Sequence, residues 1–253
     1  MRLAVLSDIH GNLTAFEAVL ADLESVGSVD KIWVLGDLAA LGPRPVECIR
    51  KVKAMQEAAE KGTFGVISGN TDRYLVTGER MPTPPAKDEE AFAKLATAWS
   101  IRDRQFNWGM AQLGFEDYEY LKKLRHELSV KVARYGPVIG YHAVPGDDEA
   151  MLLPDTPEEQ ALDYLLDREG VLAIGGHIHR QMNRDLGAWR VVNVGSVGMS
   201  FDMPGKAQWG LFTFLEDSLM VDLRAVPYDV DAVIADLHAV GFPDPDAAAA
   251  RYQ

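Results

Sequence analysis

The chain has 253 residues, and its apolar fraction of 47% is ample for a packed core, which excludes an intrinsically disordered protein. A formal charge of −13 opposes binding of a polyanion such as DNA, so no general nucleic-acid binding is expected. The lone cysteine, Cys48, fits a reducing compartment, and no apolar stretch approaches the ~20 residues of a membrane span. We therefore expect a cytoplasmic protein that does not enter membranes.

The first third of the chain alternates between short apolar runs and amphipathic segments. Continuous apolar runs predict buried strands at residues 3–6, 32–35 and 64–67. A helix is expected after Asn12, which can cap its first turn, and a second one over residues 45–60. This alternation predicts an α/β fold in which neighbouring strands are parallel.

Residues from about 78 to 125 interrupt the alternation. Helical spacing of apolar residues covers residues 88–113, and a shorter helix is expected at 118–124. The segment is too small for a comfortable core of its own, so we interpret it as a helical insertion or cap within one domain, residues 1–228.

The second half of the chain returns to strands. A helix is expected near residues 158–167, and the tail, residues 229–253, is predicted to form two helices that pack on the same domain. The expected strands are residues 128–134, 138–141, 171–174, 189–194, 211–215 and 219–225.

Polar residues of metal-ligand type follow several of the predicted strands. In open α/β sheets the carboxyl ends of the strands form the ligand crevice, so residues far apart in sequence can converge there. Their mixed oxygen and nitrogen donors suit manganese, iron, zinc, cobalt or nickel more than magnesium or calcium alone. The absence of thiolates argues against a structural zinc finger. Seven protein ligands exceed what one metal usually takes, which favours two metals. The candidates are Asp8, His10, Asp37, Asn70, His142, His177 and His179.

The order of these motifs resembles the calcineurin-like metallophosphoesterases, in particular their bacterial phosphodiesterase-like branch. The motifs are Asp-x-His at 8–10, Gly-Asp at 36–37, Gly-Asn-x-Asp at 69–72, His142 after a strand, and Gly-His-x-His at 176–179. The resemblance extends from residue 3 to about 225. It implies a two-sheet αββα sandwich with helices outside.

The resemblance also implies a role for each candidate ligand. Asp37 would bridge two divalent metals, with manganese favoured. The first metal would be held by Asp8, His10 and His179, and the second by Asn70, His142 and His177. His142 departs from the family pattern, because alanine follows it where glycine is usual.

Thr71 is the larger departure, because many members of the family have a histidine there that protonates the leaving group or stabilises the transition state. Threonine is not a useful proton donor near neutral pH. We therefore expect an enzyme in which a metal-bridging hydroxide hydrolyses phosphodiester or activated phosphoester bonds. The alternatives are a non-enzymatic metal-binding or scaffold protein on the same fold, and a general phosphomonoesterase.

Further residues next to the ligand motifs are weaker candidates. Asp72 is a second candidate catalytic residue, although it could also cap a helix. Arg44, Arg73 and Arg180 could each contact a phosphate oxygen, although a solvated arginine is the ordinary case. The expected partner is a small phosphoester, with nucleotides among the candidates, and both a monomer and a homodimer fit the sequence.

Overall fold

Two five-stranded sheets make up the centre of the computed structural model, which describes residues 1–253. In the first sheet, β1 (Arg2–Leu6), β2 (Lys31–Val34) and β3 (Phe64–Val66) are parallel neighbours, as the alternating pattern predicted. On the other side of β1, β9 (Lys206–Leu215) and β10 (Ser218–Pro227) pair antiparallel and complete the order β10-β9-β1-β2-β3.

The second sheet has the order β4-β5-β6-β8-β7. Its edge strand β7 was not predicted, because its sequence Gln-Met-Asn-Arg-Asp-Leu is mostly polar and buries only two side chains. The strands of this sheet are β4 (Glu127–Val132), β5 (Gly136–Tyr141), β6 (Leu172–Gly175), β7 (Gln181–Leu186) and β8 (Trp189–Val194).

Alternating side chains of the strands separate the molecule into layers. Leu3 and Val5 of β1 point between the sheets, where they join apolar residues of both sheets in one core. Ala4 and Leu6, on the opposite face of β1, pack against the helices outside the first sheet. This arrangement confirms the predicted two-sheet αββα sandwich.

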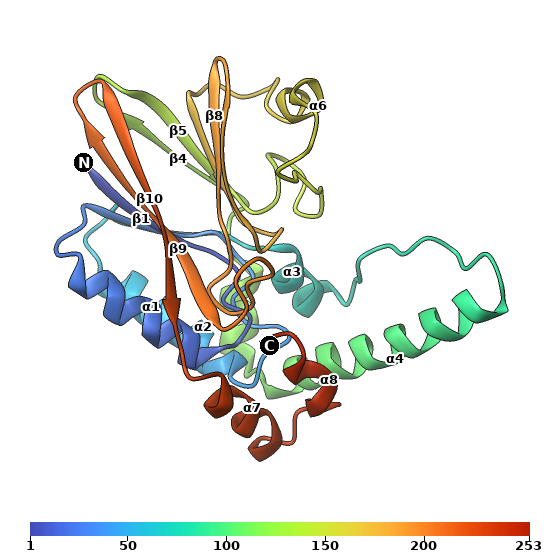
Figure 1. Ribbon diagram of the computed structural model, residues 1–253. Helices are drawn as coiled ribbons and strands as arrows, with labels where there is room; N and C mark the ends of the chain where they lie inside the picture. Colours follow the sequence, from blue (N-terminus) through green and yellow to red (C-terminus); the bar gives the residue numbers. More distant parts are fainter.

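Helices cover the outer faces of both sheets (Figure 1). The first sheet is covered by α1 (Leu13–Ser25), which Asn12 caps as predicted, and by α2 (Pro45–Ala58). The second sheet is covered by the short α6 (Glu158–Asp163). A further helix, α3 (Asn70–Thr77), was not predicted, because its short sequence is largely polar. No helix combines the length and apolar character that crossing a membrane requires.

The predicted insertion contains α4 (Glu89–Gln112) and α5 (Phe115–Lys122). The second half of α4 packs through Phe106 into the core, whereas its first half projects away from the body (Figure 1). The tail forms α7 (Val230–Ala239) and α8 (Pro245–Ala249), whose buried side chains pack against α4.

The reactivity of the Cys48 thiol reports how tightly α2 packs on the first sheet. Its side chain is fully buried, and burial raises the pKa of the thiol well above its usual range. We expect the native protein at pH 8 to resist thiol reagents, and the protein in guanidinium chloride to react at one thiol, as measured by mass spectrometry. Fast labelling of the native protein would contradict the packing of α2.

Candidate metal centre

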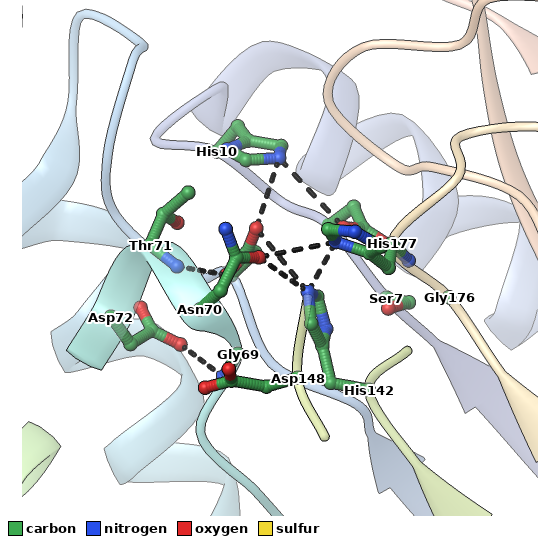
Figure 2. Close-up of polar contacts among 12 residues, drawn as sticks. Ser7, His10, Gly69, Asn70, Thr71, Asp72, His142, Asp148, Gly176 and His177 are labelled. Carbon is green, nitrogen blue, oxygen red and sulfur yellow. Dashed lines mark hydrogen bonds and ion pairs between the residues drawn. The ribbon is translucent and has the colours of Figure 1, made fainter. Parts of the chain in front are cut away.

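The predicted ligands meet where strands of both sheets end. Loops after β1, β2, β5 and β6 carry all but one of them, and Asn70 is the first residue of α3, shortly after β3. Figure 2 shows the rings of His10, His142 and His177 turned toward a common centre beside the amide of Asn70. The parallel strands therefore bring together residues that lie up to 171 positions apart in the chain, from Asp8 to His179.

The backbone of these loops is held in an unusual conformation. Five of the nine non-glycine residues with positive φ are predicted ligands, and such residues cost on the order of 1–3 kcal/mol each. Hydrogen bonds from His10 N to Asp37 O (2.8 Å) and from His177 N to Asp8 Oδ2 (2.9 Å) hold these loops together. The five residues are Asp8 (57°), His10 (49°), Asp37 (55°), His177 (70°) and His179 (53°).

Three of the histidines have the same orientation. Each places Nδ1 within hydrogen-bond distance of a backbone carbonyl, so Nδ1–H can donate and the Nε2 lone pair faces the centre. This arrangement fixes the tautomer that a metal ligand needs. The contacts are His10 to Ala40 O (3.0 Å), His142 to Leu35 O (2.7 Å) and His179 to Met199 O (2.7 Å).

His177 has the opposite orientation. Its Nε2 lies 3.2 Å from the carbonyl oxygen of Glu149, and its Nδ1 lies 3.2 Å from Oδ1 of Asn70. Donation from Nε2–H to Glu149 leaves the Nδ1 lone pair facing the centre. In these tautomers, each of the four imidazoles would present a nitrogen lone pair to the same region.

The first group of ligand atoms is crowded in a way that suits a cation. Nε2 of His10 and Nε2 of His179 lie 3.0 Å apart, and Oδ1 of Asp8 lies 3.2 Å from the latter. This Asp8 oxygen is buried and has no hydrogen-bond donor. Two lone pairs and an unpaired carboxylate oxygen within 4.8 Å of one another fit a divalent metal with oxygen and nitrogen ligands.

Asp37 lies between this group and the second one. Its Oδ2 is 3.5 Å from Nε2 of His10 and 3.5 Å from Nε2 of His142, while its Oδ1 accepts from Thr71 N at 2.9 Å. Asn70 Oδ1 lies 3.0 Å from Nε2 of His142, which adds the amide to the second group. Asp8, Asp37 and His142 thus form a second group of candidate metal-ligand atoms within 4.8 Å of one another, beside the group of Asp8, His10 and His179.

The site shifts the pKa values of two of its imidazoles in opposite directions. Burial, opposed by Asp37 and Asp8, lowers the pKa of His10 to about 4. Burial also disfavours a charged His142, but the carboxylates of Asp37 and Asp8 outweigh it and raise the pKa of His142 to about 10. His142 must therefore release a proton when it binds a metal, whereas His10 is ready to bind.

The carboxylate of Asp72 lies apart from the imidazole rings and is joined to Gly69 (Figure 2). This carboxylate accepts hydrogen bonds from Leu38 N (2.9 Å) and Gly69 N (3.1 Å). Leu38 directly follows Asp37, and Gly69 directly precedes Asn70. Burial and the nearby charge of Asp37 raise the pKa of Asp72 to about 7. In this position Asp72 braces the two loops through their backbone amides.

The three predicted arginines lie in different surroundings. Arg44 binds Asp236 of α7, with Nε 2.7 Å from Oδ2, and is engaged with the tail. Arg180 is exposed and forms no ion pair. Arg73 is partly buried among carboxylates beside a cavity of about 550 Å³. This cavity is lined by Ser68, Arg73, His126, Glu127, His142, Val144, Gly146, Asp147 and Asp148.

Two contacts of the centre were not anticipated from the sequence. The ring of Phe201 stacks on His179 with 4.6 Å between centroids, and this phenylalanine is 53% exposed. The carbonyl of Glu149 receives the His177 hydrogen bond. Both residues lie in irregular loops, where no periodicity marks them.

The chain is similar to known proteins in both sequence and fold. The profile of the calcineurin-like phosphoesterase superfamily domain matches residues 1–214. An uncharacterised protein of Methanocaldococcus jannaschii is 24% identical over 245 residues, which cover 90% of this chain and 88% of that protein. A symmetrical bis(5′-nucleosyl)-tetraphosphatase of Chromohalobacter salexigens is 30% identical over 103 residues, which are 41% of this chain but only 35% of that enzyme.

Two solved structures share the whole fold. A metallophosphoesterase from Sphaerobacter thermophilus has a TM-score of 0.71 and 22% identity, and the match covers 100% of this chain and 98% of that one. A hypothetical protein from Pyrococcus horikoshii has a TM-score of 0.79 and 24% identity, with the same coverage. The match over residues 1–214 and the shared sandwich agree with the motifs, and the chain belongs to the calcineurin-like phosphoesterase superfamily.

Proposed function

We propose that the chain is a dinuclear metal-dependent phosphoesterase that hydrolyses phosphodiester or activated phosphoester bonds. The observation that carries this proposal is the place of Asp37, whose Oδ2 lies 3.5 Å from a ligand nitrogen of each group, His10 Nε2 and His142 Nε2. A scaffold has no need of a carboxylate that lies between two sets of buried candidate ligands.

When bound, a pair of divalent metals, with manganese favoured, supplies an activated water and neutralises charge on the phosphoryl group. The residues of the chain hold the ligands ready for that chemistry. Backbone carbonyls fix the imidazole tautomers, and the amide of Thr71 orients the carboxylate of Asp37. Burial of Asp37 and both groups of ligands limits reorganisation of the site during the reaction.

Thr71 sets the preference among substrates. Its hydroxyl is buried at the second position of α3 and cannot protonate a poor leaving group near neutral pH. Leaving groups that depart as stable anions, as in aryl phosphoesters or phosphoanhydrides, do not need that proton. The cavity of about 550 Å³ beside His142 falls in the range of small-molecule sites, which allows for a leaving group of nucleotide size.

A substrate panel tests the proposal. With manganese present, we expect turnover of bis-p-nitrophenyl phosphate and p-nitrophenyl phosphate to exceed that of phosphoserine by ~10²-fold or more, because only phosphoserine needs general acid help. Faster hydrolysis of phosphoserine would favour a general phosphomonoesterase. Protein that binds two manganese ions but hydrolyses no phosphoester would favour the scaffold alternative.

A further inference from the structure

We infer that Arg73 is a positioning residue for the second metal rather than a contact for substrate phosphate. Together with Tyr74, Asp148 and Glu149 it forms a cluster, here called the Arg73 clamp, that holds His177 in its ligand orientation. The inference rests on the proposed function, since it assumes a metal held by Asn70, His142 and His177.

The clamp joins α3 to the loop that follows β5. The guanidinium of Arg73 binds Asp148 through two hydrogen bonds of 2.8 Å, from Nε and Nη2. Nη2 also donates to Oε1 of Glu149 at 2.7 Å, and the hydroxyl of Tyr74 donates to the same oxygen. A planar guanidinium with a fork of donors suits this geometry, whereas a lysine could not form it.

Every ligand of the second group is connected to this clamp. Arg73 stands three residues after Asn70 on α3, and Asp148 and Glu149 belong to the loop that His142 begins. The backbone carbonyl of Glu149 accepts from Nε2 of His177 at 3.2 Å. The side chain of Glu149 therefore anchors the residue whose carbonyl decides which nitrogen of His177 faces the centre.

The first group of ligands does not depend on this loop. Nδ1 of His10 and Nδ1 of His179 form hydrogen bonds with the carbonyl oxygens of Ala40 and Met199, which lie in other loops. Arg73 also has little capacity left for a phosphate, because its remaining nitrogen, Nη1, is paired with Glu79. A phosphate that approached Arg73 would face three carboxylates that already surround it.

Loss of the clamp should therefore weaken one metal site and spare the other. Removing an outer partner of a metal ligand typically costs 10–100-fold in metal affinity. We expect Arg73→Met to weaken one of two manganese sites by ~10–100-fold in calorimetric titration. Asn70→Ala identifies that site, because the amide belongs to the second group.

Kinetics separate positioning from substrate contact. If the clamp positions His177, excess manganese restores the kcat of Arg73→Met, and KM for bis-p-nitrophenyl phosphate stays at the wild-type value. Arg104→Met is the matched control, because Arg104 of α4 forms a similar two-bond pair with Asp244, and this variant should leave both metal sites unchanged. Tyr74→Phe removes a single donor to Glu149 and should weaken the same site by a smaller factor, which keeps the test decisive if Arg73→Met does not fold.

Three outcomes would overturn the inference. Unchanged affinity at both sites together with a raised KM would make Arg73 a substrate contact. Equal weakening of both sites would make the clamp a general structural element. If Arg73→Met kept the wild-type affinity for manganese at both sites and the wild-type kcat, the orientation of His177 would not depend on the clamp. Absence of turnover in the wild type would count against the proposed function alone, because the titrations do not depend on it.

Discussion

Replacing Asp37 by asparagine should lower kcat/KM for bis-p-nitrophenyl phosphate by ~10³-fold or more, since loss of a single transition-state donor already costs ~10²–10³-fold. The expected cause is loss of the charge that both groups of ligands share. Oδ2 of Asp37 lies 3.5 Å from His10 Nε2 and 3.5 Å from His142 Nε2, so a neutral amide at this place weakens both metal positions.

The Asp37→Asn variant removes the negative charge without disturbing the backbone at this position. Asp37 has a φ of 55°, and asparagine tolerates this left-handed region, whereas alanine would add strain to the lost carboxylate. The amide oxygen can also keep the hydrogen bond that Thr71 N donates at 2.9 Å. The variant should therefore fold, as monitored by circular dichroism, and bind fewer manganese ions than the wild type in metal analysis.

Asp155→Asn supplies the control for Asp37→Asn, because Asp155 is an exposed aspartate outside the candidate ligands. Its kcat/KM and metal content should equal those of the wild type. If Asp37→Asn kept its activity and both metals, the dinuclear proposal with a bridging carboxylate would be wrong.

Replacing Thr71 by histidine should raise turnover of phosphoserine, with an upper limit of ~10²–10⁴-fold, the usual contribution of general acid catalysis. Thr71 follows the ligand Asn70 at the start of α3, and its backbone amide bonds Asp37, so a side chain at position 71 starts beside the metal centre. Hydrolysis of bis-p-nitrophenyl phosphate should change little, because its leaving group does not need a proton.

Thr71→Val tests the hydroxyl itself. The Oγ1 of Thr71 is buried and has no partner among the protein's donors and acceptors, so valine of nearly the same shape should leave activity on diesters unchanged. A Thr71→His variant with intact fold and metal content but an unchanged rate on phosphoserine would show that position 71 is not near the leaving group. A large loss in Thr71→Val would instead assign the hydroxyl a role in catalysis.

The centre of the fold was predictable because its strands are buried on both faces. Runs such as residues 3–6 and 171–174 carry no polar residue, and continuous apolar runs of that length have few other structures available. Strand β7 lacked this signal, because an edge strand buries one face and its exposed residues can be polar. Helix α3 was not predicted for a similar reason, since its first turn consists of polar residues.

The candidate ligands were predictable because their donor side chains follow strand ends, in most motifs next to a glycine. Their surroundings were not, because those depend on contacts between distant segments. Arg44 meets Asp236 across 192 positions of the chain, and no local pattern indicates that pair. The orientation of His177 depends on the carbonyl of Glu149, a group that every residue possesses.

To move this centre into another protein, one would have to transfer the positive-φ backbone of the ligand loops as well as the ligand side chains. Five of the ligands, among them Asp8 and Asp37, require a backbone that ordinary helices and strands do not offer. A scaffold chosen only to place the right side chains at the right distances would orient their donor atoms wrongly. The transferable unit is therefore the set of strand-end loops with their crossed backbone hydrogen bonds, such as His10 N to Asp37 O, and the side chains come second.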